Sequence, residues 1–358
     1  MRHRLSFLLI GALCLIGCTN NTVIYDQKLD FKKTDTIASV TLDSAFFFAM
    51  PRQIVVADSL LIIQDTYKRD TCFHLFCDDG RYLRSFGLKG KGPGELLEPA
   101  GITVNDSMLY VYDATLNKIV SYDLWELVQG KPIRFRERNL APTPIQKPGN
   151  YTMLLKMFGY DPADSSFLFQ GNDAHLRFGN LSITDNAARA LYAEYPTVVE
   201  SGNPDENMAV WSYTAPIRIS PNGRHIVHGT YIGGLLETFD RQGDKLTHRT
   251  LRAIYPPLYR VISGIVPTAV SWDAATIIGF EDIAVTDSYI YGLLNGSEGD
   301  GYLYPQRICL FDWDGNGVRS YETDRPLAIL AVDESKHRIY ALTHEAAPRL
   351  ILLDINNL

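Results

Sequence analysis

One heptapeptide, Val56-Ala57-Asp58-Ser59-Leu60-Leu61-Ile62, recurs along the chain and carries its strongest structural signal. Its two close copies begin at Val104, with Asp106-Ser107 at the centre, and at Val285, with Asp287-Ser288 at the centre. Each copy is typical of a β-hairpin, because a polar pair separates two apolar stretches. Weaker copies begin at Pro162, Ile219 and Val332, so six units follow one another at intervals of about 45 to 65 residues. We therefore predict an all-β, six-bladed β-propeller.

A second turn repeats inside three of the units. The segments starting at Phe76, Phe239 and Phe311 all place a glycine four residues after the phenylalanine, with aspartate between them. Glycine adopts the positive φ that tight turns require, and aspartate bonds to its own turn. We expect these turns to join the outer two strands of four-stranded antiparallel blades. A short helical pattern at residues 187–195 follows the third unit.

The two ends of the repeat region predict how the ring closes. After the sixth hairpin the chain has room for one more apolar strand, at residues 349–355. Residues 37–42, ahead of the first unit, form an alternating apolar strand that can complete the last blade. Closure of this kind protects sheet edges that would otherwise aggregate.

The N-terminus resembles a bacterial lipoprotein signal. Arg2 and Arg4 precede an apolar run at residues 5–16, and Leu15-Ile16-Gly17-Cys18 resembles a lipobox. The alternative, an uncleaved membrane anchor, is disfavoured because the run is shorter than the roughly 20 residues that span a bilayer. We expect a signal peptide at 1–17, lipidation of Cys18, a tether at 18–34 and the propeller at 35–358. Since no acidic cluster follows Cys18, we expect an outer-membrane lipoprotein that faces the periplasm, with exposure at the cell surface as the alternative.

A glycine-rich stretch between the first two units carries a family resemblance. Residues 86–95, Phe-Gly-Leu-Lys-Gly-Lys-Gly-Pro-Gly-Glu, followed by Pro99, resemble the signature of TolB-like or NHL-like six-bladed propeller lipoproteins of Gram-negative bacteria. The resemblance implies the propeller fold over nearly the whole chain and no particular activity, because fold does not determine function.

Composition and cysteine spacing exclude some classes of protein. The net charge of −7 disfavours nucleic acid as a partner, because nucleic-acid binding relies on clustered Lys and Arg. Cys72 and Cys77 are too far apart along an extended strand to form a disulfide. We expect buried reduced thiols, and pairing with the distant Cys309 stays open.

No motif predicts a catalytic residue, a metal or a cofactor. The glycine-rich stretch continues into Pro93 where a phosphate-binding loop would have Lys and Ser or Thr. The segment from Asp312 to Gly317 matches half of a calcium loop, but its twelfth position is Thr323. His225 and His228 point to opposite faces of a strand, so they do not share a metal.

Loops before the innermost strands of a propeller gather around one mouth of its central channel, the default place for a ligand. Candidate ligand-binding residues are Arg52, Lys89, Lys91, Glu95, Arg218, Glu281, Asp282, Trp211 and Trp272. The alternative is that they are ordinary solvated loop residues.

Two function classes are consistent with this pattern. The first is a membrane-anchored, non-catalytic binding or scaffold propeller of the cell envelope, with a protein, peptide or glycan partner. The alternative is a metal-dependent propeller enzyme, a lactonase-like hydrolase or sugar lyase, that uses carboxylates at the channel mouth.

Overall fold

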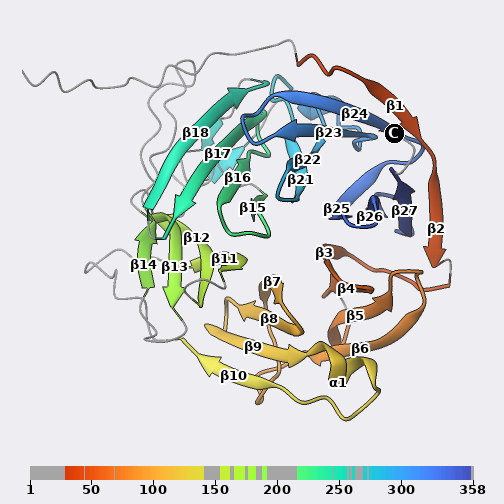
Figure 1. The fold of residues 1–358 in the computed structure, drawn as a ribbon, viewed down its shortest axis with the longest axis vertical. Helices are drawn as coiled ribbons and strands as arrows, with labels where there is room; N and C mark the ends of the chain where they lie inside the picture. Colours follow the sequence, from red (N-terminus) through yellow and green to blue (C-terminus); the bar gives the residue numbers. More distant parts are fainter. Residues whose placement is uncertain are drawn as a thin grey trace, which may run out of the picture.

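Six blades form a ring in the computed structural model of this protein, and their innermost strands surround the central axis, which is called the channel below (Figure 1). The structure describes residues 29–43, 45–67, 69–140, 154–161, 165–173, 176–182, 188–191, 216–243, 245–255, 258, 260–262, 269–271 and 274–355. The expected signal peptide and Cys18 lie outside these residues, as do Trp211 and Trp272. No helix within the described residues is long and apolar enough to cross a membrane.

Each blade is an antiparallel sheet whose first strand faces the channel. Blade 1 contains β3 (Pro51–Ala57), β4 (Leu60–Asp65), β5 (Thr71–Cys77) and β6 (Tyr82–Leu88). Blade 2 contains β7 (Pro99–Asn105), β8 (Met108–Asp113), β9 (Lys118–Asp123) and β10 (Arg136–Asn139). Blade 3 contains β11 (Leu154–Asp161), β12 (Ser166–Asp173), β13 (Leu176–Ser182) and β14 (Ala188–Leu191).

The second half of the ring repeats this arrangement. Blade 4 contains β15 (Ile217–Ile219), β16 (His225–Gly229), β17 (Leu235–Gln242) and β18 (Lys245–Ala253). Blade 5 contains β21 (Phe280–Val285), β22 (Tyr289–Leu294), β23 (Arg307–Asp312) and β24 (Gly317–Thr323). Blade 6 contains β25 (Leu327–Asp333), β26 (Arg338–Thr343) and β27 (Leu350–Asp354). Outside the blades lie the hairpin β19 (Arg260–Ile262) and β20 (Ala269–Ser271), helix α1 (Leu124–Val128) and the 3₁₀ turn η1 (Gly299–Gly301).

The N-terminal segment closes the ring as predicted. Strand β2 (Ser39–Asp43) pairs antiparallel with β27, with Thr41 opposite Ile351, and completes blade 6. The sequence did not predict the preceding strand, β1 (Thr34–Ile37), which adds a fifth strand to blade 5. It runs parallel to β24, with Thr34 opposite Ser320. The N-terminal segment therefore joins two neighbouring blades.

The repeated turns are confirmed. Asp58 and Asp106, at the hairpins of blades 1 and 2, have φ of 52° and 50°, a region that aspartate tolerates better than most residues. Gly80, Gly243 and Gly315 occupy the turns between the outer two strands of blades 1, 4 and 5, also at positive φ. The helix predicted at 187–195 is wrong for residues 188–191, the part that the structure describes, because these residues form β14 and pair with β13.

The hydrophobic core lies between the blades. The buried apolar side chains of the described residues form six clusters, and each cluster joins two neighbouring blades. Leu61 of blade 1, for example, packs in the same cluster as Tyr340 of blade 6. Since each blade buries its faces against its neighbours, the ring holds the innermost strands and the loops before them in fixed positions.

Candidate functional site

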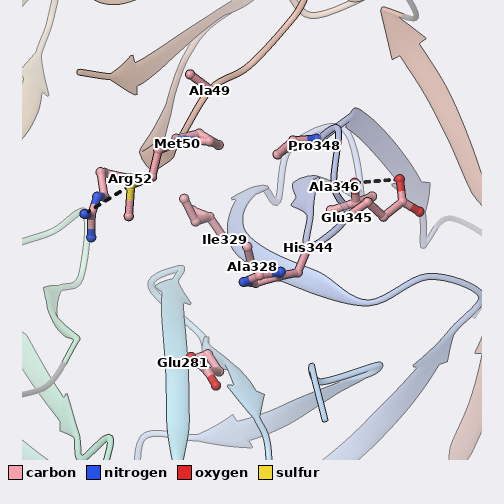
Figure 2. A pocket seen from close by; sticks show the side chains of 12 residues that line it. Ala49, Met50, Arg52, Glu281, Ala328, Ile329, His344, Glu345, Ala346 and Pro348 are labelled. Atoms are coloured by element: carbon pink, nitrogen blue, oxygen red, sulfur yellow. Dashed lines mark hydrogen bonds between the residues drawn. The ribbon is translucent and has the colours of Figure 1, made fainter. Parts of the chain in front are cut away.

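A cavity of about 390 Å³ opens at the end of the channel where the innermost strands begin (Figure 2). Blades 1, 5 and 6 contribute its lining, which is Ala49, Met50, Pro51, Arg52, Glu281, Ala328, Ile329, Thr343, His344, Glu345, Ala346 and Pro348. The lining is mostly apolar with a few charged groups, and its volume lies in the range of small-ligand sites.

β-bulges select the residues that enter this cavity. The pairing of β3 with β4 shifts between Pro51 and Gln53, which leaves Arg52 outside the regular ladder. The same shift occurs around Glu281 in blade 5 and around Ala328 in blade 6. All three residues line the cavity. A bulge re-aims the side chain of its extra residue, so these bulges explain why the three residues share one site.

A buried aspartate fixes the loop that carries Met50. The Asp65 carboxylate, at the end of β4, accepts hydrogen bonds from the backbone N–H groups of Ala49 (2.8 Å) and Met50 (2.9 Å). Asp113, at the equivalent end of β8, accepts from the backbone N–H groups of Leu97 and Glu98 at 2.6 and 2.9 Å. Charge-assisted bonds of this kind hold the loops before β3 and β7 rigidly.

Glu281 is surrounded by hydrogen-bond donors and aromatic rings. Its Oε1 accepts bonds from Asn295 Nδ2 (2.9 Å) and from the Tyr302 hydroxyl (2.5 Å). Burial raises the pKa of the Glu281 carboxyl, and the two donors oppose that rise. Tyr302 packs edge-on against Tyr304, which in turn stacks on the His344 ring. Glu281 thus occupies an aromatic wall of the mouth.

Three cationic side chains, Arg52, Lys156 and Arg218, lie near the starts of innermost strands of three blades. Arg218 pairs with Asp282 at 2.7 Å, and Asp282 also accepts the Leu330 backbone N–H at 3.1 Å. Burial and the charge of Arg218 lower the pKa of Lys156 to about 8; Asp282 opposes this shift, and Arg52 adds a smaller lowering effect. Residues of β3, β11, β15 and β21 therefore influence one another electrostatically across the channel.

The predicted site residues divide into two groups. Arg52 and Glu281 line the cavity, and Arg218 and Asp282 form the neighbouring ion pair. The remaining described candidates, Lys89, Lys91 and Glu95, lie on the loop between blades 1 and 2 and do not line the cavity. Within that loop, Lys89 donates to the Thr66 carbonyl at 3.2 Å, and the Glu95 carboxylate accepts the Gly92 N–H at 2.7 Å.

Sequence reasoning missed Met50, His344 and Lys156. Met50 and His344 are single residues in loops, and Lys156 lies in an otherwise apolar strand without a motif. The available signal was positional, because Arg52, Lys156, Arg218 and Asp282 all lie near the start of an innermost strand.

The weaker motifs have structural roles. Asp312 accepts hydrogen bonds from Asn316, and Asp314 pairs with Arg249 at 2.7 Å, so both carboxylates of the half calcium loop already have partners. Among the described residues, no group of three or more His, Cys, Asp and Glu side chains is placed to hold a metal ion. His225 pairs with Asp240, away from buried His228. The three described cysteines, Cys72, Cys77 and Cys309, are free thiols.

The family comparison agrees with this architecture. The sequence model of the TolB-like 6-blade propeller-like family matches residues 30–335. The chain belongs to this family. No curated protein matches this TolB-like chain.

Solved structures show the same fold at low sequence identity. One is a Bacteroides fragilis protein whose name describes it as exported, with 10% identity, a TM-score of 0.51, and coverage of 90% of this chain and 98% of that chain. Another is the WD40 repeat domain of RRP9, also with 10% identity and a TM-score of 0.51, covering 90% of this chain and 99% of that chain. Identities this low establish the propeller fold alone.

Proposed function

We propose that this TolB-like propeller is a lipid-anchored, non-catalytic binding or scaffold module of the bacterial cell envelope. It takes a protein, peptide or glycan at the mouth of its channel. The cavity formed by blades 1, 5 and 6 is the observation that carries the proposal, because it combines an apolar lining with a few charged groups on a rigid frame.

The surroundings of the cavity support a binding role. Large apolar side chains project into solvent on the same loops, including Phe47, Met50, Leu303 and Tyr304 at 63, 42, 73 and 41% exposure. Exposed apolar groups around a concave site favour contact with a partner. The lipobox-like segment ending at Cys18 supports an envelope location, and so does the exported Bacteroides fragilis protein of similar fold.

A pull-down comparison tests the proposal. Wild-type protein is compared with Ala346→Trp, which fills the mouth from an exposed position, and with Ser59→Trp, at an exposed hairpin at the opposite ends of the strands. We expect an envelope component to copurify with wild type and Ser59→Trp and to be lost from Ala346→Trp. Equal recovery with all three proteins, or no component above background, would remove the support for a site at the mouth. A Cys18→Ala variant that still fractionates with membranes would refute the lipid anchor.

A further inference from the structure

The cavity wall contains a cationic side chain that lacks an acidic partner among the described residues. Arg52 is exposed there, and its guanidinium donates a hydrogen bond to the Met50 sulfur at 3.6 Å and forms no ion pair with a described residue. Arg218, by contrast, pairs with Asp282. Lys156, on β11 of blade 3, does not line the cavity. Arg52 is therefore the positive charge of the lining that is available to a ligand.

The acidic groups of the cavity are held on its other walls. Glu281 lies on β21 and is bound by Asn295 and Tyr302. Glu345 accepts the Thr343 hydroxyl at 3.2 Å, and Figure 2 shows it beside Ala346, across the cavity from Arg52. Both carboxylates therefore have hydrogen-bond donors of their own, and neither forms an ion pair with Arg52.

Apolar surface adjoins Arg52 directly. Met50 and Pro51 precede it in the chain, and Ile329, Ala346 and Pro348 also line the cavity. A ligand that consisted of charge alone would leave this surface exposed to water. An acid attached to an apolar group would cover it and gain free energy in proportion to the apolar area buried.

We propose that the mouth binds a carboxylate attached to an apolar group, with the carboxylate directed to Arg52 and the apolar part against Met50 and Pro348. This inference rests on the proposed function and names the ligand chemistry of that site. A guanidinium recognises a carboxylate through two parallel hydrogen bonds when the geometry is bidentate. A free organic acid and the C-terminus of a peptide share this chemistry.

Calorimetric titration of the protein, purified in a nonionic detergent, tests the inference. The probes are N-acetyl-leucine, which mimics a peptide C-terminus, its neutral analogue N-acetyl-leucinamide, hexanoate and glucuronate. We expect N-acetyl-leucine to bind about tenfold or more tightly than the amide, because charged hydrogen bonds distinguish them. Comparable binding of hexanoate indicates a free acid as the source, whereas selective binding of N-acetyl-leucine indicates a peptide end.

Site variants locate the carboxylate. We expect R52Q to weaken N-acetyl-leucine binding about tenfold and to leave the amide unaffected. Lys131→Met removes an exposed lysine outside the cavity and serves as the matched control, with unchanged affinity expected. Melting curves establish that each variant is folded.

Four results would overturn the inference. Equal affinity for acid and amide would exclude carboxylate recognition, and preference for glucuronate would exclude the apolar contact in favour of a sugar acid. An acid preference that survives R52Q would refute the placement of the carboxylate at Arg52. No binding of any probe, while an envelope component is still lost from Ala346→Trp, would refute the carboxylate alone. If Ala346→Trp also has no effect, the proposed function fails as well.

Discussion

The buried ion pair between blades 3 and 4 gives a sharp test of how the ring is held together. Arg177 of β13 donates to both oxygens of Glu237 on β17, and both side chains are 2% exposed. His228 and His248 lie within 3.6 and 3.3 Å of the same carboxylate. Removing one partner of a buried pair costs about 3 to 5 kcal/mol, because the other charge loses its compensation. We expect Glu237→Gln to lower the free energy of unfolding by that amount.

Urea unfolding at pH 7 measures the effect, read as a shift of the midpoint at constant slope. Glu322→Gln is the matched control, since Glu322 and its partner Arg307 are 47 and 39% exposed and 3.5 Å apart. Such a pair contributes about 0 to 1 kcal/mol. If Glu237→Gln costs no more than Glu322→Gln, the reasoning is refuted. A combined Arg177→Met and Glu237→Leu variant is expected to recover most of the loss, because it leaves no isolated charge.

The acid dependence of stability gives the same pair a second readout. Burial would raise the pKa of Glu237, but the charge of Arg177 and hydrogen bonds from His228, His248 and Arg177 hold it well below 4.5. A lowered carboxyl pKa contributes stability that is present above the unfolded pKa and lost as pH falls below it. Wild type should therefore lose stability below about pH 4.5 more steeply than Glu237→Gln.

Three further predictions follow from other parts of the ring. Burial and the charge of Arg69 lower the pKa of His74 from 6.5 to about 4, so stability should fall by up to about 1.4 kcal/mol per pH unit as pH decreases through that window. A His74→Gln variant with an unchanged slope would exclude His74 as the cause. Gly101→Ala should lower the free energy of unfolding by about 2 kcal/mol or more, because φ at this position is +132° and a Cβ would overlap the Met157 carbonyl oxygen. Gly243→Ala, at φ +59° in open space, should lower it by about 1 kcal/mol. Equal losses of the two variants in urea unfolding would contradict this. Burial raises the pKa of the Cys72 thiol to about 11 and that of the Cys309 thiol to about 12. A thiol reagent at pH 8 should therefore label Cys77, which is only partly buried, well before either of them. Equal labelling rates of the three thiols in the native protein would refute this prediction.

The fold was predictable because local signals repeat. The Asp-Ser hairpins and the Phe-to-Gly turns require particular backbone angles, so residue type alone located them. The closing strand near Thr41 followed from counting strands. The parallel pairing of β1 with β24 had no local signal, because it joins Thr34 to Ser320 across most of the chain.

The site was only half predictable. Arg52 and Glu281 were found because they lie in loops before innermost strands, which the repeat pattern located. The sequence did not show the bulges that direct both side chains into one cavity, because a bulge depends on pairing with the neighbouring strand. Lys156 has no motif of its own, and its relation to Arg52 arises only when blade 3 closes on the ring.

Photo-crosslinking in intact cells tests the central claim, a binding site at the channel mouth, most directly. A photoreactive residue is placed at Met50, which is 42% exposed beside the cavity, or at Trp125, which is 63% exposed near the opposite ends of the strands. A discrete crosslinked product is expected from position 50, abolished by Ala346→Trp, and no such product is expected from position 125. Crosslinking from position 125 alone, or a product from position 50 that persists with Ala346→Trp, would contradict it.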